Sequence, residues 1–217
     1  MIDTRTTNVF WHHGAITRTD REHTNRHKSC IIWLSGLSGS GKTTIAYKLE
    51  EKLFQRGVRS YVLDGDNIRQ GLNKNLGFSK EDREENIRRI GEVAKLFVDA
   101  GIIAITAFIS PYRKDRDRVR SIVKEGDFIE CYVRCSIECC EKRDTKGLWG
   151  RARRGEVKEF TGISAPYEEP LNPELILDTE NETIEESQSK IMKYLIAKGY
   201  IEDRRQETED TKVRTKK

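Results

Sequence analysis

Short apolar runs and amphipathic segments alternate along most of the chain. The run Ile31-Ile32-Trp33-Leu34 is apolar at every position, a pattern typical of a strand that is covered on both faces of a parallel sheet. Comparable runs predict five strands, at residues 30–34, 60–64, 102–109, 128–133 and 175–177. At 217 residues the chain is long enough for one well-buried α/β domain with a modest insertion and too short for two full-sized ones.

Between the runs, apolar residues recur at helical spacing. Ile45, Leu49 and Leu53 share one face of a predicted helix over residues 42–55, and Gly57 provides its stop signal. A longer helix begins near the capping pattern at residues 79–82 and ends at Gly101. Further helices are predicted at residues 112–124, 137–143 and 184–197. This alternation predicts an α/β fold with a doubly wound, mostly parallel sheet and helices on both faces.

The same pattern predicts the domain boundaries. Residues 1–28 are polar and indicate an N-terminal arm lying on the domain of residues 29–200, with only Val9, Phe10, Trp11 and Ile16 able to pack. The alternation stops at about residues 145–170, where a connection of this length is a lid or is disordered, and we expect a lid. Residues 201–217 are almost entirely charged or polar, so they predict a disordered tail.

Composition narrows the class of protein. Among the 217 residues, 35% are charged and the net charge is only +4, which describes a mixed-sign surface and gives no support for a nucleic-acid partner. No run approaches the roughly 18 apolar residues of a membrane span, so we expect no membrane partner. The first residues also lack the apolar core of a signal peptide, so we expect a cytoplasmic protein.

Four of the five cysteines lie close together in the sequence, on a predicted strand and the helix that follows it. These are Cys131, Cys135, Cys139 and Cys140. Because they lack the paired C-x-x-C spacing of zinc sites, buried reduced thiols are favoured over metal binding.

The strongest chemical signal is a phosphate-binding loop between the first strand and the helix after it. The segment reads Gly36-Leu37-Ser38-Gly39-Ser40-Gly41-Lys42-Thr43. Glycines let consecutive backbone N–H groups turn toward phosphate oxygens at a helix N-terminus. Lys42 then reaches the β- and γ-phosphates, and the Thr43 hydroxyl is a candidate ligand of Mg²⁺. The fold is therefore predicted to be of the P-loop NTPase type, with ATP as the expected nucleotide because guanine-recognition motifs are missing.

Carboxylates follow the second predicted strand. Asp64 and Asp66 lie at its carboxyl end, where open α/β sheets bind ligands. A carboxylate there can orient Mg²⁺-bound water or accept the proton of an attacking hydroxyl. Alternatively, Asp66 or Asn67 is the N-cap of a short helix over residues 68–72. The residues alone leave both roles open.

Several blocks, taken together, carry a family resemblance. Residues 36–44, Asp64-Gly65-Asp66-Asn67 within 64–73, Leu76-Gly77-Phe78-Ser79 and residues 82–89 resemble adenylylsulfate (APS) kinases. Residues 108–113, 146–148, 160–163 and 166–168 agree, and residues 8–18 resemble the segment before the family's first strand. Thr145, Trp149 and Gly150 depart from residues that are common in the family, so the resemblance does not fix the contacts of the lid. It nevertheless covers nearly the whole chain.

The resemblance implies an enzyme of sulfate activation. It would phosphorylate the 3′-hydroxyl of adenosine 5′-phosphosulfate (APS) with ATP and Mg²⁺, giving 3′-phosphoadenosine 5′-phosphosulfate and ADP. It also implies a homodimer to which the arm contributes, and a functional link to an ATP sulfurylase. Two rivals are a nucleotide or sugar-acid kinase of the same architecture and a module that binds ATP without turnover.

Site residues are implied position by position. The expected ATP-binding residues are Gly36, Leu37, Ser38, Gly39, Ser40, Gly41, Lys42, Thr43 and Thr44. The expected APS-binding residues are Asp66, Asn67, Ile68, Arg69, Phe78, Arg83, Asn86, Ile109, Ser110, Lys146 and Phe160. In this assignment Phe78 and Phe160 cover the two faces of the adenine, which suits flat aromatic side chains.

The expected catalytic residues are Lys42, Asp64, Asp66, Ser110 and Lys146. Asp66 is our hypothesis for the general base, with Asp64 second and metal ligation as the competing role. The resemblance also makes Ser110 a candidate phosphoserine intermediate. A direct transfer needs only positioning and charge neutralisation, so we favour a turn or hydrogen-bonding role for Ser110.

Overall fold

A five-stranded, fully parallel sheet organises the molecule. The computed structural model describes residues 9–10 and 12–203. The strands are β1 (Ile31–Ser35), β2 (Ser60–Asp64), β3 (Ile103–Ala107), β4 (Phe128–Arg134) and β5 (Leu175–Asp178). They lie in the order β2-β3-β1-β4-β5, with β1 in the centre and all five of its residues buried.

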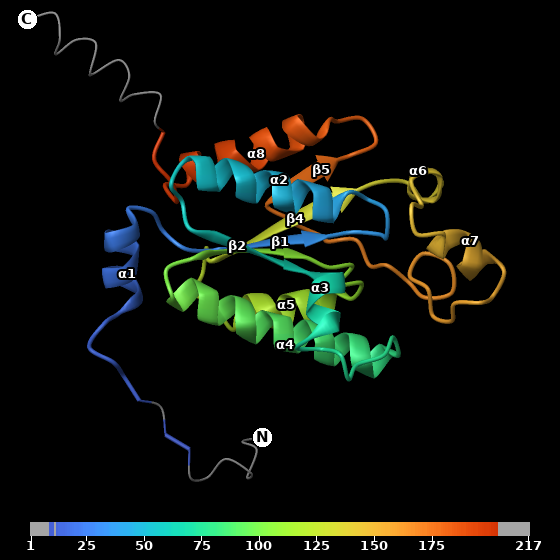
Figure 1. Ribbon diagram of the computed structural model, residues 1–217, viewed down its shortest axis with the longest axis horizontal. Helices are drawn as coiled ribbons and strands as arrows, with labels where there is room; N and C mark the ends of the chain where they lie inside the picture. Colours follow the sequence, from blue (N-terminus) through green and yellow to red (C-terminus); the bar gives the residue numbers. More distant parts are fainter. Residues whose placement is uncertain (1–8, 11, 204–217) are drawn as a thin grey trace, which may run out of the picture.

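Helices cover both faces of the sheet (Figure 1). On one face, α2 (Lys42–Gln55) and α8 (Ile184–Ala197) pack over a core that includes Ile45, Leu49 and Leu195. On the other, α4 (Lys80–Asp99) and α5 (Arg113–Ser121) pack over a second core that includes Ile90 and Val119. The predicted doubly wound, P-loop type α/β fold is therefore confirmed.

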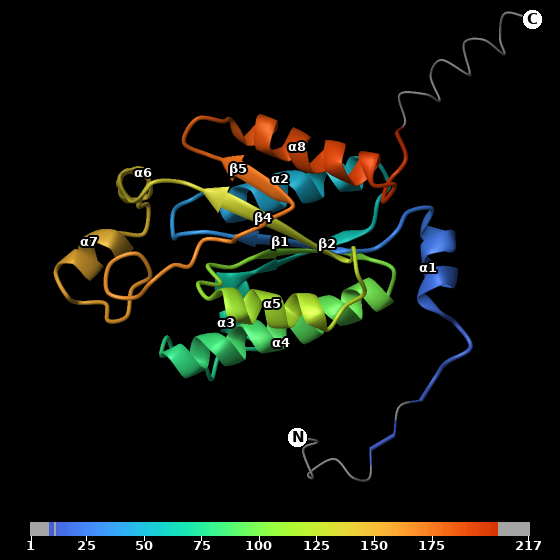
Figure 2. The same ribbon diagram turned by 180° about the vertical axis from the view of Figure 1, so that it is seen from behind.

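Different elements lie at the carboxyl ends and at the amino ends of the strands. Three short helices, α3 (Gly65–Gln70), α6 (Ile137–Lys142) and α7 (Leu148–Arg153), lie at the carboxyl ends of the strands, and α1 (Arg18–Asn25) lies at the opposite edge (Figures 1 and 2). Loops at the carboxyl ends of parallel strands are where this fold class binds ligands. Among the described residues, no helix combines the length and the apolar character needed to cross a membrane.

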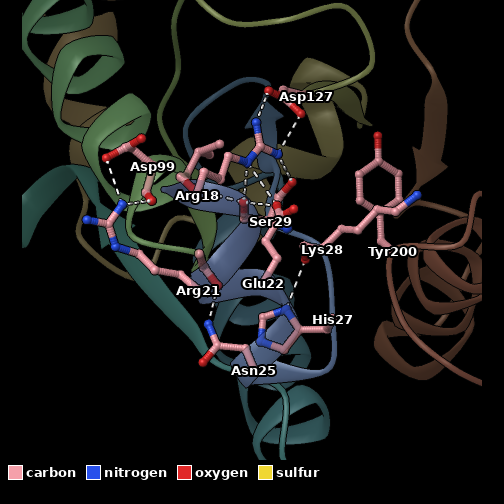
Figure 3. A network of polar contacts seen from close by, with 12 residues as sticks. Arg18, Arg21, Glu22, Asn25, His27, Lys28, Ser29, Asp99, Asp127 and Tyr200 are labelled. Carbon is pink, nitrogen blue, oxygen red and sulfur yellow. Dashed lines mark hydrogen bonds and ion pairs between the residues drawn. The ribbon is translucent and has the colours of Figure 1, made fainter. Parts of the chain in front are cut away.

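Helix α1 is held to the domain by polar contacts (Figure 3). The Arg18 guanidinium donates to Glu22 at 2.8 Å, to the Ser29 carbonyl at 2.8 Å and to Asp127 at 2.8 Å. The helix itself contains no buried residue. Val9, Phe10 and Ile16, the arm side chains able to pack, are 75%, 75% and 62% exposed, and Trp11 lies outside the described residues.

Several boundaries differ from the sequence predictions. Strand β3 ends at Ala107 instead of residue 109. The segment at about 145–170 contains α7 and a hydrophobic cluster around Trp149, Ala152 and Phe160, so it is partly ordered, and its role as a lid stays a prediction. Ile201 is only 5% exposed and packs in the core, which excludes it from the predicted tail. Residues 204–217 of that tail lie outside the described residues.

Candidate active site

The phosphate-binding loop connects the buried end of β1 to the first turn of α2. Its glycines Gly36, Gly39 and Gly41 all have positive φ angles, which favour glycine. A Cβ atom on Gly36 would lie 2.4 Å from the Val133 carbonyl oxygen, so a side chain cannot be accommodated there. Backbone space and conformation therefore both require the glycine pattern found in the sequence.

Lys42 lies inside this loop. Its ammonium group donates to the carbonyl oxygens of Gly36 at 2.9 Å and Leu37 at 2.7 Å. Burial lowers the pKa of Lys42 to about 8, partly offset by the nearby carboxylates Asp64 and Asp66. The loop thus holds its lysine in a poorly hydrated position, where a phosphate oxygen would be a stronger partner than a neutral carbonyl.

Asp64 joins the loop to α3. Its carboxylate accepts from the Thr43 hydroxyl at 2.8 Å and from the backbone N–H of Asp66 at 3.0 Å. Asp64 is thereby the N-cap of α3, so the expectation that Asp66 or Asn67 caps a helix over residues 68–72 is wrong. The helix starts earlier because Asp64 already provides the capping oxygen. A buried carboxylate beside the Thr43 hydroxyl is a pair of hard oxygen donors, the kind that Mg²⁺ prefers.

Asp66 and Lys146 form an ion pair between α3 and the 145–170 segment. Their side chains are 68% and 59% exposed, so the pair contributes at most about 1 kcal/mol to stability. Asn67 lies beside them and donates to the Tyr47 hydroxyl at 3.0 Å. The contact brings together two residues that the sequence analysis assigned to catalysis from distant parts of the chain.

Phe78 is 61% exposed and presents its ring beside two arginines. The Arg69 guanidinium lies 4.4 Å from the ring centroid, within cation–π range. Phe160, in contrast, is 8% exposed and contacts Trp149 edge-on at 5.0 Å between centroids. The proposed stacking of an adenine between the two phenylalanines therefore stays a prediction, with Phe78 the more accessible ring.

Arg83 connects α4 to the 145–170 segment. It donates to the Phe78 carbonyl at 2.8 Å, to the Thr161 hydroxyl at 2.8 Å and to the Glu159 carbonyl at 2.6 Å. Its guanidinium therefore lies between the exposed Phe78 and the residues around Phe160. No sequence pattern predicts this bridging role.

Ser110 is buried in a strained backbone conformation after β3. Its φ angle is +40°, and its hydroxyl accepts from the Trp33 indole N–H at 3.1 Å. Ile109 precedes it and its carbonyl accepts from the Gly36 N–H at 3.4 Å. Ser110 thus lies next to the phosphate-binding loop, but its hydroxyl is engaged in the core.

Asn86 and Ile68, two further expected APS-binding residues, lie at the second core. Asn86 is 5% exposed and accepts from the Asn73 side-chain amide at 2.9 Å. Ile68 is partly buried against the same core as α4. The Asn73 contact thus joins the segment after α3 to α4, and Ile68 packs α3 against the second core.

The sequence analysis did not predict that three further residues contact Ser110 or the phosphate-binding loop. Arg116 is 1% exposed and donates to the Ser110 carbonyl at 2.6 Å and to Glu130 at 2.7 Å. Trp149 donates to the Ser38 carbonyl at 3.1 Å, and Thr179 donates to the Ser40 carbonyl at 2.8 Å. Arg116 looks like a surface residue in a strongly basic helix, and the other two carry no local signal.

The basic stretch at residues 151–154 does not converge on the loop. Arg153 pairs with Glu141 at 2.6 Å, and Arg151 and Arg154 pair with Glu156 at 3.4 and 2.6 Å. All three are more than half exposed. These arginines therefore form solvent-exposed ion pairs with neighbouring carboxylates.

Comparison with known proteins identifies close relatives. Residues 28–178 match the family model described as adenylylsulphate kinase. A probable adenylyl-sulfate kinase from Halalkalibacterium halodurans is 62% identical over 87% of this chain and 94% of its own length. An adenylyl-sulfate kinase from Staphylococcus haemolyticus is 61% identical over 91% and 99%. The Mycobacterium tuberculosis APS kinase CysC, solved in complex with AMPPNP and APS, is similar with a TM-score of 0.75 and 42% identity, covering 78% of this chain and 98% of that one.

Proposed function

Because this chain belongs to the adenylylsulphate kinase family, we propose that it transfers the terminal phosphoryl group of ATP to the 3′-hydroxyl of APS. The products are 3′-phosphoadenosine 5′-phosphosulfate and ADP. The observation that supports the proposal is a complete phosphate-binding loop next to the start of α3, where the resemblance expects acceptor residues: the Thr43 hydroxyl donates to Asp64, the N-cap of α3, at 2.8 Å. Asp64 and Asp66 connect the two sets.

The donor half of the site consists of the loop, Lys42 and Asp64. Loop amides and the Lys42 ammonium hold the phosphates of ATP and neutralise the charge that develops during transfer. Thr43 and Asp64 provide oxygen ligands for Mg²⁺, which supplies further neutralisation on the phosphate oxygens when bound. The Thr43 to Asp64 hydrogen bond of 2.8 Å supports this pairing.

The acceptor half consists of Phe78, Arg83 and the residues after β3. Phe78 offers an exposed ring face for the adenine of APS, and the planar Arg83 donors suit its phosphosulfate oxygens. Arg83 already binds two oxygens of the 145–170 segment, so acceptor binding and the position of that segment are linked. The ion pair of Lys146 with Asp66 supports the proposal that Lys146 bridges the two substrates.

A direct assay tests the proposal. The full-length protein is mixed with Mg-ATP and, separately, with APS, a nucleoside monophosphate or a sugar acid, and ADP release is followed together with the phosphorylated product. Of the three acceptors, we expect only APS to give rapid ADP release from Mg-ATP. Lys42→Ala should lose that activity. Turnover of another acceptor without turnover of APS would reject the proposal in favour of a different kinase. Nucleotide binding without any turnover would favour a binding module.

Asp66 is proposed as the general base for the 3′-hydroxyl. Asp64 is less suited because both of its carboxylate oxygens already accept hydrogen bonds, whereas Asp66 is exposed and, within residues 9–10 and 12–203, pairs with the exposed Lys146 side chain. We expect Asp66→Asn to lower kcat about a hundredfold or more while the Kd for Mg-ATP stays within about threefold. Glu81→Gln, an exposed carboxylate on α4, is the control. If Mg-ATP affinity falls in parallel with kcat, Asp66 is a metal ligand instead.

The cellular setting is part of the proposal. We propose a cytoplasmic location, as the sequence analysis expects. A homodimer is proposed because Val9, Phe10 and Ile16 expose apolar side chains that a second copy would cover. A reaction that makes APS from ATP and sulfate must supply the acceptor, which is the basis for a link to an ATP sulfurylase. Sedimentation of the full-length chain tests the dimer, and a monomer at micromolar concentration would contradict it.

A further inference from the structure

Two cysteines and a glutamate converge next to the phosphate-binding loop. Cys135 follows β4, Cys139 lies on α6, and Glu180 lies in the turn between β5 and α8. The two Sγ atoms and a carboxylate oxygen all lie within 4.8 Å of one another. The sequence analysis did not find this group because it looked for paired C-x-x-C spacing, whereas Cys135 and Cys139 are separated by three residues and Glu180 comes from another loop.

We propose that Cys135, Cys139 and Glu180 bind a soft divalent cation of the Zn²⁺ class. Two thiolates and one carboxylate are donors that favour zinc over magnesium. Ligands on one tetrahedral zinc lie roughly 3.5–3.8 Å apart, given bonds of about 2.0–2.3 Å. Donor atoms within 4.8 Å of each other therefore need to move by only about an ångström to meet a common ion.

The burial of the three residues fits an ion that reaches the site from solvent. Cys135 is 7% exposed, Cys139 is half-buried and Glu180 is exposed. Glu180 thus provides the accessible side, and water can fill the fourth position. The site uses none of the residues assigned to ATP, Mg²⁺ or APS.

Neighbouring groups already orient the ligands, as outer-shell groups do in metal sites. The Ser136 backbone N–H donates to Glu180 at 3.2 Å, and the Ser136 hydroxyl accepts from the Cys139 N–H at 3.2 Å. The Arg143 guanidinium donates to the Cys135 sulfur at 3.6 Å. Two thiolates and a carboxylate carry three negative charges, which a divalent cation and Arg143 together balance.

Metal binding would replace protons on both thiols. Each thiol releases one proton to solvent as its sulfur binds the ion. No electron transfer or additional reactant is involved.

The site also contacts the phosphate-binding loop through its neighbours. Arg143 donates to the Thr179 carbonyl at 2.6 Å, and the Thr179 hydroxyl donates to the Ser40 carbonyl at 2.8 Å. A Cβ atom on Gly39 would lie 2.9 Å from the Cys140 carbonyl oxygen. An ion bound to Cys135, Cys139 and Glu180 would therefore connect α6 with the turn after β5, the two segments that contact the phosphate-binding loop.

The test is a titration of the reduced, full-length protein with Cd²⁺, which gives a thiolate-to-cadmium charge-transfer absorption in the ultraviolet. We expect this absorption to saturate at one equivalent and to be displaced by Zn²⁺ but not by Mg²⁺. The absorption distinguishes thiolate ligation from binding to histidines. It requires no kinase activity, so its outcome is independent of the proposed function.

Variants locate the site. We expect Cys139→Ser to reduce the absorption by about half or more, Glu180→Gln to weaken Cd²⁺ binding about tenfold or more, and Glu138→Gln, an exposed carboxylate on α6, to bind like the parent protein. Thermal unfolding of each variant verifies that it folds, and because Cys139 is only half-buried its variant provides the test if Cys135→Ser does not fold. Absence of the absorption in the parent protein, or full absorption in Cys139→Ser, would overturn the proposal.

Discussion

Lys42 shows how burial of one side chain sets a measurable property of the site. The loop carbonyls accept its hydrogen bonds but do not compensate fully for lost hydration, so its pKa falls to about 8. A triphosphate favours the charged form of the lysine and raises its pKa again. Nucleotide binding is therefore coupled to protonation of Lys42.

We predict that ATP affinity decreases as the pH rises above about 8. The free protein loses the Lys42 proton there, whereas the complex retains it, so the Kd increases by up to roughly tenfold per pH unit. Titration calorimetry with Mg-AMPPNP at pH 7 to 9.5 measures this change. Lys42→Ala should bind weakly with a Kd that varies little over the same range. An equally steep dependence in the variant would assign the effect to another group.

Ser110 illustrates a residue whose geometry argues for a structural role. Its hydroxyl accepts the hydrogen bond of the fully buried Trp33 indole, and its carbonyl accepts from Arg116. A phosphoryl group on this oxygen would have to displace the Trp33 contact inside the core. Direct transfer avoids that cost.

We predict that Ser110→Ala retains kcat within about tenfold while its free energy of unfolding falls by about 1–3 kcal/mol, because the buried indole N–H loses its acceptor. Steady-state kinetics and urea unfolding measure the two quantities. A trapping experiment is the complement. If labelled ATP alone phosphorylated Ser110 at a rate matching turnover, direct transfer would be wrong.

At the scale of elements, Arg83 links α4 with the 145–170 segment. We predict that Arg83→Ala raises the KM for APS about tenfold or more and speeds proteolysis within residues 155–165, because two hydrogen bonds to that segment are lost. Arg88→Ala, which removes an ion pair with Glu85 on the same helix, is the matched control. Equal effects of the two variants would mean that general destabilisation of α4 is responsible.

Helix α1 depends on polar contacts and so responds to pH. Desolvation opposes ionisation of Glu22, but hydrogen bonds from the Ser29 hydroxyl, the Ser29 N–H and Arg18 outweigh it and lower the pKa of Glu22 below its usual 4.5. A carboxylate with a lowered pKa stabilises the fold above pH 4.5, and this contribution is lost as the pH falls through the lowered value.

We predict that Glu22→Gln lowers the free energy of unfolding at pH 7 by about 1–3 kcal/mol and flattens the loss of stability below pH 4.5. Chemical denaturation at a series of pH values measures both effects. Glu51→Gln, which breaks the exposed pair with Lys48, should change stability by less than 1 kcal/mol. An unchanged acid profile in Glu22→Gln would contradict the assigned role.

For the whole molecule, the sequence predicted the layers better than their order. Strands with unbroken apolar runs and helices such as α2 and α8 follow directly from local patterns. The order β2-β3-β1-β4-β5 depends on how the crossover connections pack, which no local pattern encodes. Helices α1 and α7 were missed because they are short and bury few or no residues.

The site divides in the same way. Lys42, Thr43 and Asp64 were predictable because they belong to contiguous motifs at the ends of two strands that a parallel sheet brings together. The roles of Arg116 and Thr179 were not, since each joins segments that are distant in the sequence. Burial of Arg116 inside a basic helix is a tertiary effect that composition conceals.

The placement of α1 and of the last described residues has a practical consequence. The Lys28 N–H donates to the Tyr200 carbonyl at 2.9 Å, so both ends of the folded domain meet at the edge of the sheet opposite the phosphate-binding loop (Figure 1). A surface or a second enzyme tethered after residue 203 would face away from the entrance for nucleotides. A fusion partner or surface attached there is therefore expected to leave the phosphate-binding loop accessible.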